Sequence, residues 1–576
     1  MALRIPNLIH VPAGAHYDEA ANGVLAAEIG LEGERPVFIP SYTGKEVLFF
    51  YLAGGLMRLV GEGVFVLRLT AVFVSLLTIA TTYWLGMELC HDRRIALLAA
   101  ALLAVSFWHL LLSRLGFRAI TLPLLQALTI AALWRAYRQN RWPWLFAAGV
   151  FMGLAAYTYL AVRLFPVLLI IALLPILLNK ADWRRRWGQT AVFALIALLV
   201  ATPLLLYFWQ HPQAFWVRIG QVSPGQNSLS LSESLWKSLE MLFLQGDPYV
   251  RFNMPGRPLF DWFWGGLLIV GWLVLLSRWR TIATDWQRSG YLLLILAPLI
   301  MLLPTALAVN EIVPSNLRAI GLIPFIFYLP PIGLITLLND LYKRFQRPEP
   351  TTGAIITFVL LLIVGGLTAE RLYFRQWGVR NDLFLATDGD LTAVAQFLNT
   401  YDLSHKQLYV AALHYQHPTL AYLSEAYDQI KWLPESEAVV FPAEGTAVII
   451  YPANSPLPRW ASPYFSQAAL LPSPNAPDGG PAFLAYEVSQ PPSLNISHPV
   501  GIDFGGSITL LGYDLEEGAP DGTVPLTLYW QVTQPQSGDY TPFAHLEDSQ
   551  GHRWSQVETF AYPLHNGHGE RSLCSV

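Results

Sequence analysis

Charged side chains are scarce in this sequence. Asp, Glu, Lys and Arg together make up 13% of the 576 residues, whereas a soluble domain has about 25%. Apolar residues account for 54%, and the mean hydropathy is +0.40. A chain of this composition is solvated mostly by lipid, so we interpret it as a polytopic α-helical membrane protein.

Cysteine is also scarce, and the net charge is small. Only Cys90 and Cys574 are present, which excludes a disulfide framework and a cysteine-based metal site. The formal net charge of -4 over 576 residues is too small to indicate a nucleic-acid partner or an acidic one.

The chain begins with a short polar stretch and two short helices. Residues 1–10 are too short and too polar to cross a bilayer, and they lack the basic start and apolar core of a signal peptide. We therefore expect no membrane segment before Asp18. Ala20–Ile29 has helical apolar spacing, and Glu46–Val60 is an apolar run shorter than the roughly 20 residues that a span needs. Both are predicted to be helices at the membrane interface.

Ten apolar segments are predicted to span the membrane. Several are shorter than a full span, and the two segments on either side of Val162 and Arg163 could form one broken helix. The predicted spans are Phe65–Leu89, Ile95–Leu112, Ile120–Trp134, Trp144–Tyr159, Leu164–Leu178, Ala191–Phe208, Phe260–Leu276, Tyr291–Val309, Ala319–Leu338 and Ala354–Thr368.

Basic residues are unequally divided between the loops that join these spans. Every second loop is rich in Arg and Lys, as cytoplasmic loops are. The Asp18 segment, the turns at 114–118 and 310–318, the loop 210–259 and everything after residue 370 are therefore predicted on the outer face of the membrane. The basic residues of the predicted cytoplasmic loops are Arg93, Arg94, Arg135, Arg138, Arg141, Lys180, Arg184, Arg185, Arg186, Arg278, Arg280, Arg288, Lys343, Arg344 and Arg347.

The loop from Gln210 to Leu259 is exceptional for its length. It contains Pro224-Gly225 and a predicted amphipathic helix from Glu233 to Leu244. The loop could cover a cavity, or it could be a surface excursion without a role.

Beyond Arg371 the composition becomes that of a soluble protein. A helix at Leu391–Leu398 capped by Asp390, buried strands at Gln407–Ala412 and Ala447–Tyr451, and a helix at Pro418–Ala426 suggest a small α/β unit.

Apolar and polar residues alternate between Ile508 and Leu546, around a turn at Asp521-Gly522. This pattern is typical of a β-sandwich. The pattern stops after Tyr562, and 566–576 has no strand character, so the sandwich is expected to be incomplete. The predicted organisation is a transmembrane domain at 1–370, an α/β domain at 371–471, a linker rich in Pro, Ser and Asn at 472–495, and a β-sandwich-like domain at 496–576.

The densest group of potentially reactive side chains in the first half of the chain precedes the spans. It consists of His16-Tyr17-Asp18-Glu19, Asn22 and Lys45-Glu46. Adjacent carboxylates near a bilayer surface are costly unless they are solvated, paired or bound to something, which favours a function. The alternative is a solvated turn in which Asp18 caps a helix that starts at Glu19 or Ala20.

Several features in sequence order resemble the GT-C membrane glycosyltransferases. They are the Asp-Glu pair, a lysine that opens a short apolar helix, Leu67-Arg68-Leu69 in the first span, and the turn Ser113-Arg114-Leu115-Gly116-Phe117-Arg118. From Ala15 to Leu338 the chain is most similar to bacterial members of the dolichyl-phosphate-mannose protein mannosyltransferase family, to which the lipid A aminoarabinose transferases are related. The resemblance implies a GT-C-like fold of about ten spans, with C-terminal add-on domains.

The sequence departs from the family in two places. Relatives usually have a spanning helix before the Asp-Glu loop, and this chain is expected to lack it. Many have two prolines after the lysine, where this chain has Glu46 and Val47. Glu46 could pair with Lys45 and weaken its hold on a phosphate.

The resemblance implies transfer of a sugar from a polyprenyl phosphate to an acceptor hydroxyl of a protein, lipid or glycan. Asp18 would act as the base that takes the hydroxyl proton, and Glu19 would orient the acceptor or Asp18. Lys45 would bind the lipid phosphate, whose negative charge grows as it departs.

Further candidate substrate-binding residues are implied by their position at the outer face. Each arginine among them could instead be an interfacial anchor, and His16 could be an ordinary polar loop residue. These candidates are Arg114, Arg118, Arg163, Arg318, His16 and Tyr17.

No metal and no cofactor are expected. His16 and His109 could ligate a metal together with Asp18, but this is a weak signal. His414 and His417 are interpreted as surface residues.

Two other functions remain open. A transporter or lipid-carrier flippase would tend to show internal repeats, and we find no repeat. A receptor that binds through its C-terminal domains would not need Asp18.

Overall fold

The computed structural model describes the chain except residues 43, 180–181, 223–228, 283, 345–350, 415, 435–437, 443–444, 516–523, 533–542, 559–570 and 576. Lys180, Pro224-Gly225, Arg347 and the Asp521-Gly522 turn therefore lie outside the described residues. The chain forms two compact units. The helical unit comprises Met1–Pro12 and Ala21–Val379, and the sheet unit comprises Ala13–Ala20 and Arg380–Val576.

A hairpin of short helices opens the helical unit. α1 (Tyr17–Ala27), whose first turn is grouped with the sheet unit, continues into the π-helical turn η1 (Glu28–Glu32). The antiparallel strands β1 (Phe38–Ile39) and β2 (Lys45–Glu46) follow, and then α2 (Leu48–Val60). The two short helices predicted from the sequence are thus confirmed as helices.

Glycine allows η1 to lie directly on α2. A Cβ added to Gly54 would be 2.5 Å from the Ala26 carbonyl oxygen, and one added to Gly30 would be 2.5 Å from that of Gly54. Both distances are far shorter than a carbon–oxygen contact allows, so the backbones approach this closely only because neither residue has a side chain.

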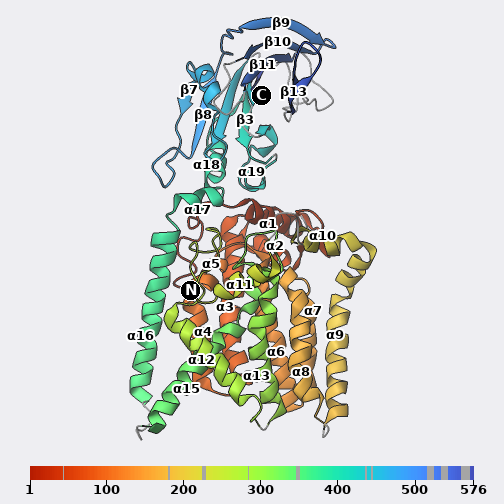
Figure 1. The fold of residues 1–576 in the computed structure, drawn as a ribbon, viewed down its shortest axis with the longest axis vertical. Coiled ribbons are helices and arrows are strands. Elements are labelled where there is room, and N and C mark those ends of the chain that lie inside the picture. Colours follow the sequence, from red (N-terminus) through yellow and green to blue (C-terminus); the bar gives the residue numbers. More distant parts are fainter. Residues whose placement is uncertain are drawn as a thin grey trace. The chain divides into compact units, whose positions relative to one another are not determined.

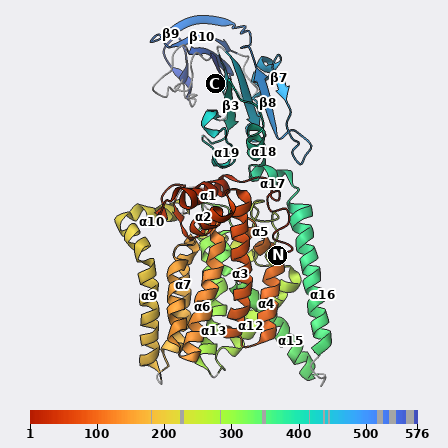
Figure 2. The same ribbon diagram turned by 180° about the vertical axis from the view of Figure 1, so that it is seen from behind.

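All ten predicted spans fall on helical segments, and most of these helices run side by side in one bundle (Figures 1 and 2). Six helical stretches in the described part of the chain are long and apolar enough to cross a membrane. The number of ten spans stays a prediction. The helices are α3 (Val64–Leu89), α4 (Arg93–Val105), α5 (Phe107–Leu112), α6 (Thr121–Gln139), α7 (Trp142–Ala155), α8 (Phe165–Leu177), α9 (Trp183–Gln210), α12 (Trp262–Arg278), α13 (Asp285–Met301), α14 (Leu303–Ala306), α15 (Leu329–Arg344) and α16 (Thr351–Glu370).

Two predicted spans are interrupted. Ser106 adopts an extended backbone with ψ 126° between α4 and α5, and its hydroxyl accepts the His109 amide at the start of α5. The span predicted at Ala319–Leu338 begins as the 3₁₀ turns η4 (Arg318–Leu322) and η5 (Phe325–Tyr328), with Pro324 between them. A proline cannot donate the backbone hydrogen bond that a continuous helix requires.

Two predicted cytoplasmic loops meet at one end of the bundle. α6 packs against α3, and the Glu88 carboxylate forms ion pairs with Arg135 and Arg138 at 2.7 Å each. The side of the membrane on which this end lies stays a prediction.

The long loop contains α10 (Pro212–Val222) and α11 (Leu231–Glu240), and the latter confirms the helix predicted near Glu233.

The helical unit also extends past the predicted domain boundary at residue 370. The π-helical turn η6 (Arg371–Trp377) follows α16, and the Trp377 indole donates to the Val250 carbonyl at 2.7 Å.

The sheet unit contains the predicted α/β fold. Its first sheet has the order β4-β3-β6-β8-β7, in which the first three strands are parallel. The strands are β3 (Lys406–Ala412), β4 (Ile430–Pro434), β6 (Thr446–Pro452), β7 (Ala469–Leu471) and β8 (Phe483–Val488). The helices α17 (Asn381–Ala386), α18 (Gly389–Leu398) and α19 (Pro418–Leu423) accompany it. The residue that precedes α18 is Asp388, so the predicted cap at Asp390 is wrong.

A second sheet follows the order β5-β14-β11-β10-β9, and β12 pairs with β13 separately. The strands are β5 (Ala438–Phe441), β9 (His498–Phe504), β10 (Ile508–Leu515), β11 (Leu526–Val532), β12 (Phe543–Glu547), β13 (Arg553–Glu558) and β14 (Arg571–Ser575). Two predictions are wrong. β8 lies in the expected linker at 472–495, and β14 lies in the stretch 566–576, which was expected to have no strand.

Substitution of Gly54 tests the close approach of η1 and α2. We expect Gly54→Ala to lower the free energy of unfolding by about 1–3 kcal/mol, because the methyl group forces two backbones apart. Gly55→Ala is the matched control, since a Cβ there meets nothing within 4 Å and alanine is the better helix former. Thermal unfolding of the purified protein measures both, and equal midpoints would contradict the packing.

Candidate functional site

A lysine and an asparagine form the centre of a polar group in the helical unit. Lys45 is 2% exposed, and its Nζ donates to Asn22 Oδ1 at 2.8 Å. Asn22 Nδ2 in turn donates to the Gly116 carbonyl at 2.8 Å. The Lys45 ammonium group also lies 4.9 Å from the centre of the Tyr42 ring. Asn22 therefore joins α1, β2 and the turn 113–118.

The neighbouring carboxylate pairs with an arginine. Glu46 and Arg118 are both nearly buried, and Arg118 Nε donates to Glu46 Oε2 at 2.9 Å. Successive strand residues point to opposite faces, so the Glu46 and Lys45 side chains diverge. Glu46, considered from the sequence as a partner of Lys45, thus forms an ion pair with Arg118.

Arg163 adds a third cation. Its Nη1 donates to the Phe215 carbonyl at 3.0 Å, and its guanidinium lies 3.9 Å from the centre of the Phe215 ring. Glu46 also interacts electrostatically with Arg163. We call Asn22, Lys45, Glu46, Arg118 and Arg163 the cationic cluster, because it contains three positive charges and one negative charge.

Two other candidate arginines have contacts that favour a structural role. Arg114 is fully buried, and its guanidinium packs against the Tyr373 and Phe374 rings. It donates to the carbonyl oxygens of Leu3, Arg4, Asn7 and Val11. Arg318 forms an ion pair with Glu311 at 2.8 Å. Binding of a substrate by either residue stays a prediction.

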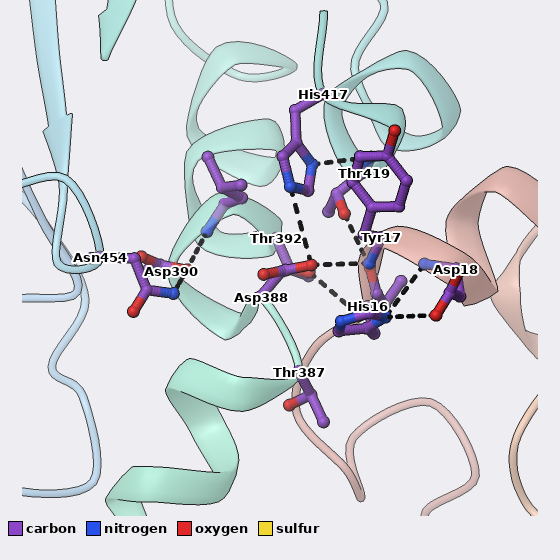
Figure 3. A network of polar contacts seen from close by, with 12 residues as sticks. His16, Tyr17, Asp18, Thr387, Asp388, Asp390, Thr392, His417, Thr419 and Asn454 are labelled. Carbon is purple, nitrogen blue, oxygen red and sulfur yellow. Dashed lines mark hydrogen bonds and ion pairs between the residues drawn. The ribbon is translucent and has the colours of Figure 1, made fainter. Parts of the chain in front are cut away.

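The Asp18 segment belongs to the sheet unit, where α18 and α19 hold its backbone (Figure 3). The Tyr17 amide donates to Asp388 Oδ2 at 2.6 Å. The Ala15 amide donates to Thr392 Oγ1 at 3.1 Å, and Thr419 Oγ1 donates to the Ala15 carbonyl at 2.8 Å.

Asp18 lies in the first turn of α1, not before it. The Asp18 amide donates to His16 Nδ1 at 3.0 Å, so His16 rather than Asp18 caps the helix. The Asp18 side chain is 43% exposed, with Oδ2 3.8 Å from His16 Nδ1, whereas Glu19 is buried. A base needs access to its substrate, and the exposure of Asp18 provides this.

His417 is buried, contrary to its interpretation as a surface residue. It is 3% exposed, and its Nδ1 accepts the Thr419 amide at 3.3 Å, so the proton of the neutral ring is on Nε2. Burial, and to a lesser degree nearby His414, lowers the pKa of His417 to about 4. The Tyr17 ring lies edge-on to His417, with 5.1 Å between the ring centres.

Sequence reasoning did not identify the hydrogen-bond partners that hold the Asp18 segment. Asp388, Thr392 and Thr419 follow it by more than 370 positions, and no local pattern connects sites so far apart. Within the described part of the chain, no three His, Cys, Asp or Glu residues are grouped so that they could hold a metal ion.

The buried imidazole of His417 makes stability depend on pH. The unfolded chain protonates a histidine near pH 6.5, whereas folded His417 resists protonation down to about pH 4. The free energy of unfolding should therefore fall by up to about 3 kcal/mol as the pH falls through this range.

We expect His417→Asn to reduce this pH dependence, because asparagine retains a helix-capping acceptor and does not titrate. His405→Asn is the control, since this exposed residue has φ 61°, which asparagine tolerates. Thermal unfolding between pH 4.5 and 7.5 measures the effect. The prediction would be contradicted if the wild-type unfolding temperature fell over this pH range by no more than that of His417→Asn.

Comparison with known proteins supports the resemblance seen in the sequence. The family model described as dolichyl-phosphate-mannose-protein mannosyltransferase matches residues 45–207. This stretch includes Lys45, Glu46, Arg118 and Arg163 of the cationic cluster.

Three similar proteins are each named undecaprenyl phosphate-alpha-4-amino-4-deoxy-L-arabinose arabinosyl transferase. The chain is 25% identical to the Erwinia tasmaniensis protein over 345 residues, which are 54% of this chain and 60% of that protein. It is 24% identical to the Enterobacter sp. (strain 638) protein over 384 residues, 60% of this chain and 66% of that protein. It is 25% identical to the Pseudomonas paraeruginosa protein over 407 residues, 64% of this chain and 68% of that protein. The chain thus spans less than two thirds of the first two relatives.

A solved structure has the same fold. The crystal structure of ArnT from Cupriavidus metallidurans bound to undecaprenyl phosphate matches with a TM-score of 0.51 and 14% sequence identity. The match covers 84% of this chain and 96% of that one. The chain is therefore similar to the dolichyl-phosphate-mannose-protein mannosyltransferase family and to bacterial arabinosyl transferases, and it has the GT-C fold of ArnT.

Proposed function

We propose that this chain is an integral membrane glycosyltransferase. It transfers a sugar, a hexose or a pentose, from a polyprenyl-phosphate-linked donor to the hydroxyl of a protein, lipid or glycan acceptor. The cationic cluster is the observation that carries this proposal. It lies mostly in the stretch that matches the family model, and the similar proteins are named for a donor of this chemistry, an undecaprenyl-phosphate-linked sugar.

The charge of the cationic cluster suits a lipid phosphate. Cationic donors stabilise the negative charge that grows on a departing phosphate. The cationic cluster contains three such donors, Lys45, Arg118 and Arg163. Lys45 and Arg118 donate to phosphate oxygens in this proposal, and Asn22 and Glu46 hold these two cations in place.

In the proposed reaction, Asp18 is the general base. The acceptor oxygen attacks the anomeric carbon, the bond from this carbon to the phosphate oxygen breaks, and the phosphate leaves with the electron pair. Asp18 takes the acceptor proton. Glu19 orients the acceptor or Asp18.

The proposed location is the bacterial inner membrane, with Asp18 and the sheet unit on the extracytoplasmic side. The alternation of basic loops along ten segments supports this orientation. The Glu88 contacts with Arg135 and Arg138 support it too, since they bring two of the predicted cytoplasmic loops to the same end of the bundle.

Replacement of Asp18 tests the base. We expect Asp18→Asn to lower kcat about 10²- to 10⁴-fold, because the amide cannot accept the proton at neutral pH. Transfer of radiolabelled sugar from a panel of polyprenyl-phosphate donors, in membranes that contain the full chain, measures this. Asp402→Asn, at an exposed turn of the sheet unit, is the control. Equal transfer by wild type and Asp18→Asn would refute the role of Asp18.

Replacement of Lys45 tests the phosphate site. We expect Lys45→Gln to lower kcat/KM for the donor about 10²- to 10³-fold, because a cation aimed at the departing phosphate is lost. The KM for the acceptor should stay within about threefold, since Lys45 does not contact it in this proposal. Lys237→Gln removes an exposed cation of α11 that pairs with Glu233 and should change neither constant. If only the KM for the acceptor changed, Lys45 would not be a ligand of the donor phosphate.

A further inference from the structure

The first turn of α1 has an unusual set of acceptors. The first amides of a helix have no partner within the helix, and in α1 two of them are satisfied by side chains. The Asp18 amide donates to His16 beside it, and the Tyr17 amide donates to Asp388 at 2.6 Å, which lies 371 positions further along the chain.

Asp388 precedes α18, but its carboxylate accepts a hydrogen bond from α1. It precedes α18 with φ 53°, in the left-handed region, and its carboxylate does not cap α18. This carboxylate instead accepts from α1, where a negative charge at the N-terminus is favourable. Its side chain is 14% exposed, so water competes little for the bond.

The preceding residues are held by the same elements. Thr392 of α18 and Thr419 of α19 bond to the two backbone groups of Ala15. A Cβ on Gly14 would collide with the Thr387 carbonyl oxygen. Residues 14–17 are therefore fixed against α18 and α19, and Asp18 follows them immediately (Figure 3).

We propose that Asp388 is a positioning residue, which fixes the first turn of α1 through the Tyr17 amide and thereby aims the Asp18 carboxylate for proton abstraction. This inference rests on the proposed function. Loss of the bond would let the first turn unwind, and a small displacement of a reacting group is costly, since about 1 Å can reduce the rate 10²-fold.

Two substitutions of Asp388 separate this role from general stability. Asp388→Gly removes the acceptor and fits the left-handed backbone without strain. Asp388→Asn fits it too and keeps one oxygen that accepts the Tyr17 amide. We expect Asp388→Gly to lower kcat about 10- to 100-fold with the donor KM within about threefold. Asp388→Asn should stay within about threefold of wild type in both constants.

Hydrogen exchange of the full chain gives a readout that does not depend on catalysis. The amides of residues 15–18 should exchange faster in Asp388→Gly and at the wild-type rate in Asp388→Asn. Thr392→Val, which removes the acceptor of the Ala15 amide, should also make these amides exchange faster. Thr400→Val is its control, because Thr400 is exposed in the turn after α18 and its hydroxyl donates to carbonyls of α18.

The inference is supported if Asp388→Gly has faster exchange and lower kcat, while Asp388→Asn keeps the wild-type exchange rate and a kcat close to that of wild type. Unchanged exchange overturns it, and so does faster exchange with unchanged kcat. Failure of the proposed function has a different signature, since transfer would then be unaffected by Asp18→Asn while the exchange difference persists.

Discussion

Burial of positive charge is the constraint on which the helical unit depends. Lys45, Arg68, Arg114 and Arg118 are all at most 7% exposed in a unit made mainly of apolar helices. Each of these cations would be destabilising without hydrogen bonds or an opposite charge. The way in which each is compensated separates structural cations from candidates for ligand binding.

Backbone carbonyls compensate two of the arginines. Arg68 donates to the carbonyls of Leu8, Ile9 and Pro12, and Arg114 donates to those of four residues between Leu3 and Val11. Together they fix Met1–Pro12, which leads directly to the Asp18 segment. Lys45 and Arg118 instead contact polar side chains: Lys45 donates to Asn22, and Arg118 donates to Glu46 as well as to the Gly44 carbonyl. This difference from the carbonyl-bound arginines is why we assign the phosphate to the cationic cluster.

The sequence predicted well what depends on local composition. Apolar runs located the helices because lipid-facing segments must be apolar along their length. Short, nearly continuous apolar runs located the buried strands β3 and β6. The sequence grouped Asn22, Lys45 and Glu46, and the structure adds their contacts: Lys45 donates to Asn22, and Glu46 accepts from Arg118.

The sequence could not predict contacts that depend on distant pairing. β14 is short and polar, and it is a strand only because β11 and β5 supply partners on both sides. His417 looked like a surface residue because its burial depends on α18 and the Asp18 segment. Asp388 likewise lies 371 positions after Tyr17, so no local pattern predicts the hydrogen bond between them.

Binding of the lipid carrier tests the central claim most directly. The purified full chain would be titrated with undecaprenyl phosphate and, separately, with undecaprenol, which has the same chain and no phosphate. Our account predicts saturable binding of the phosphate form that weakens with rising salt, and at least about tenfold weaker binding of the alcohol, because the cationic cluster recognises the charge. Equal affinity for the two lipids would contradict the account.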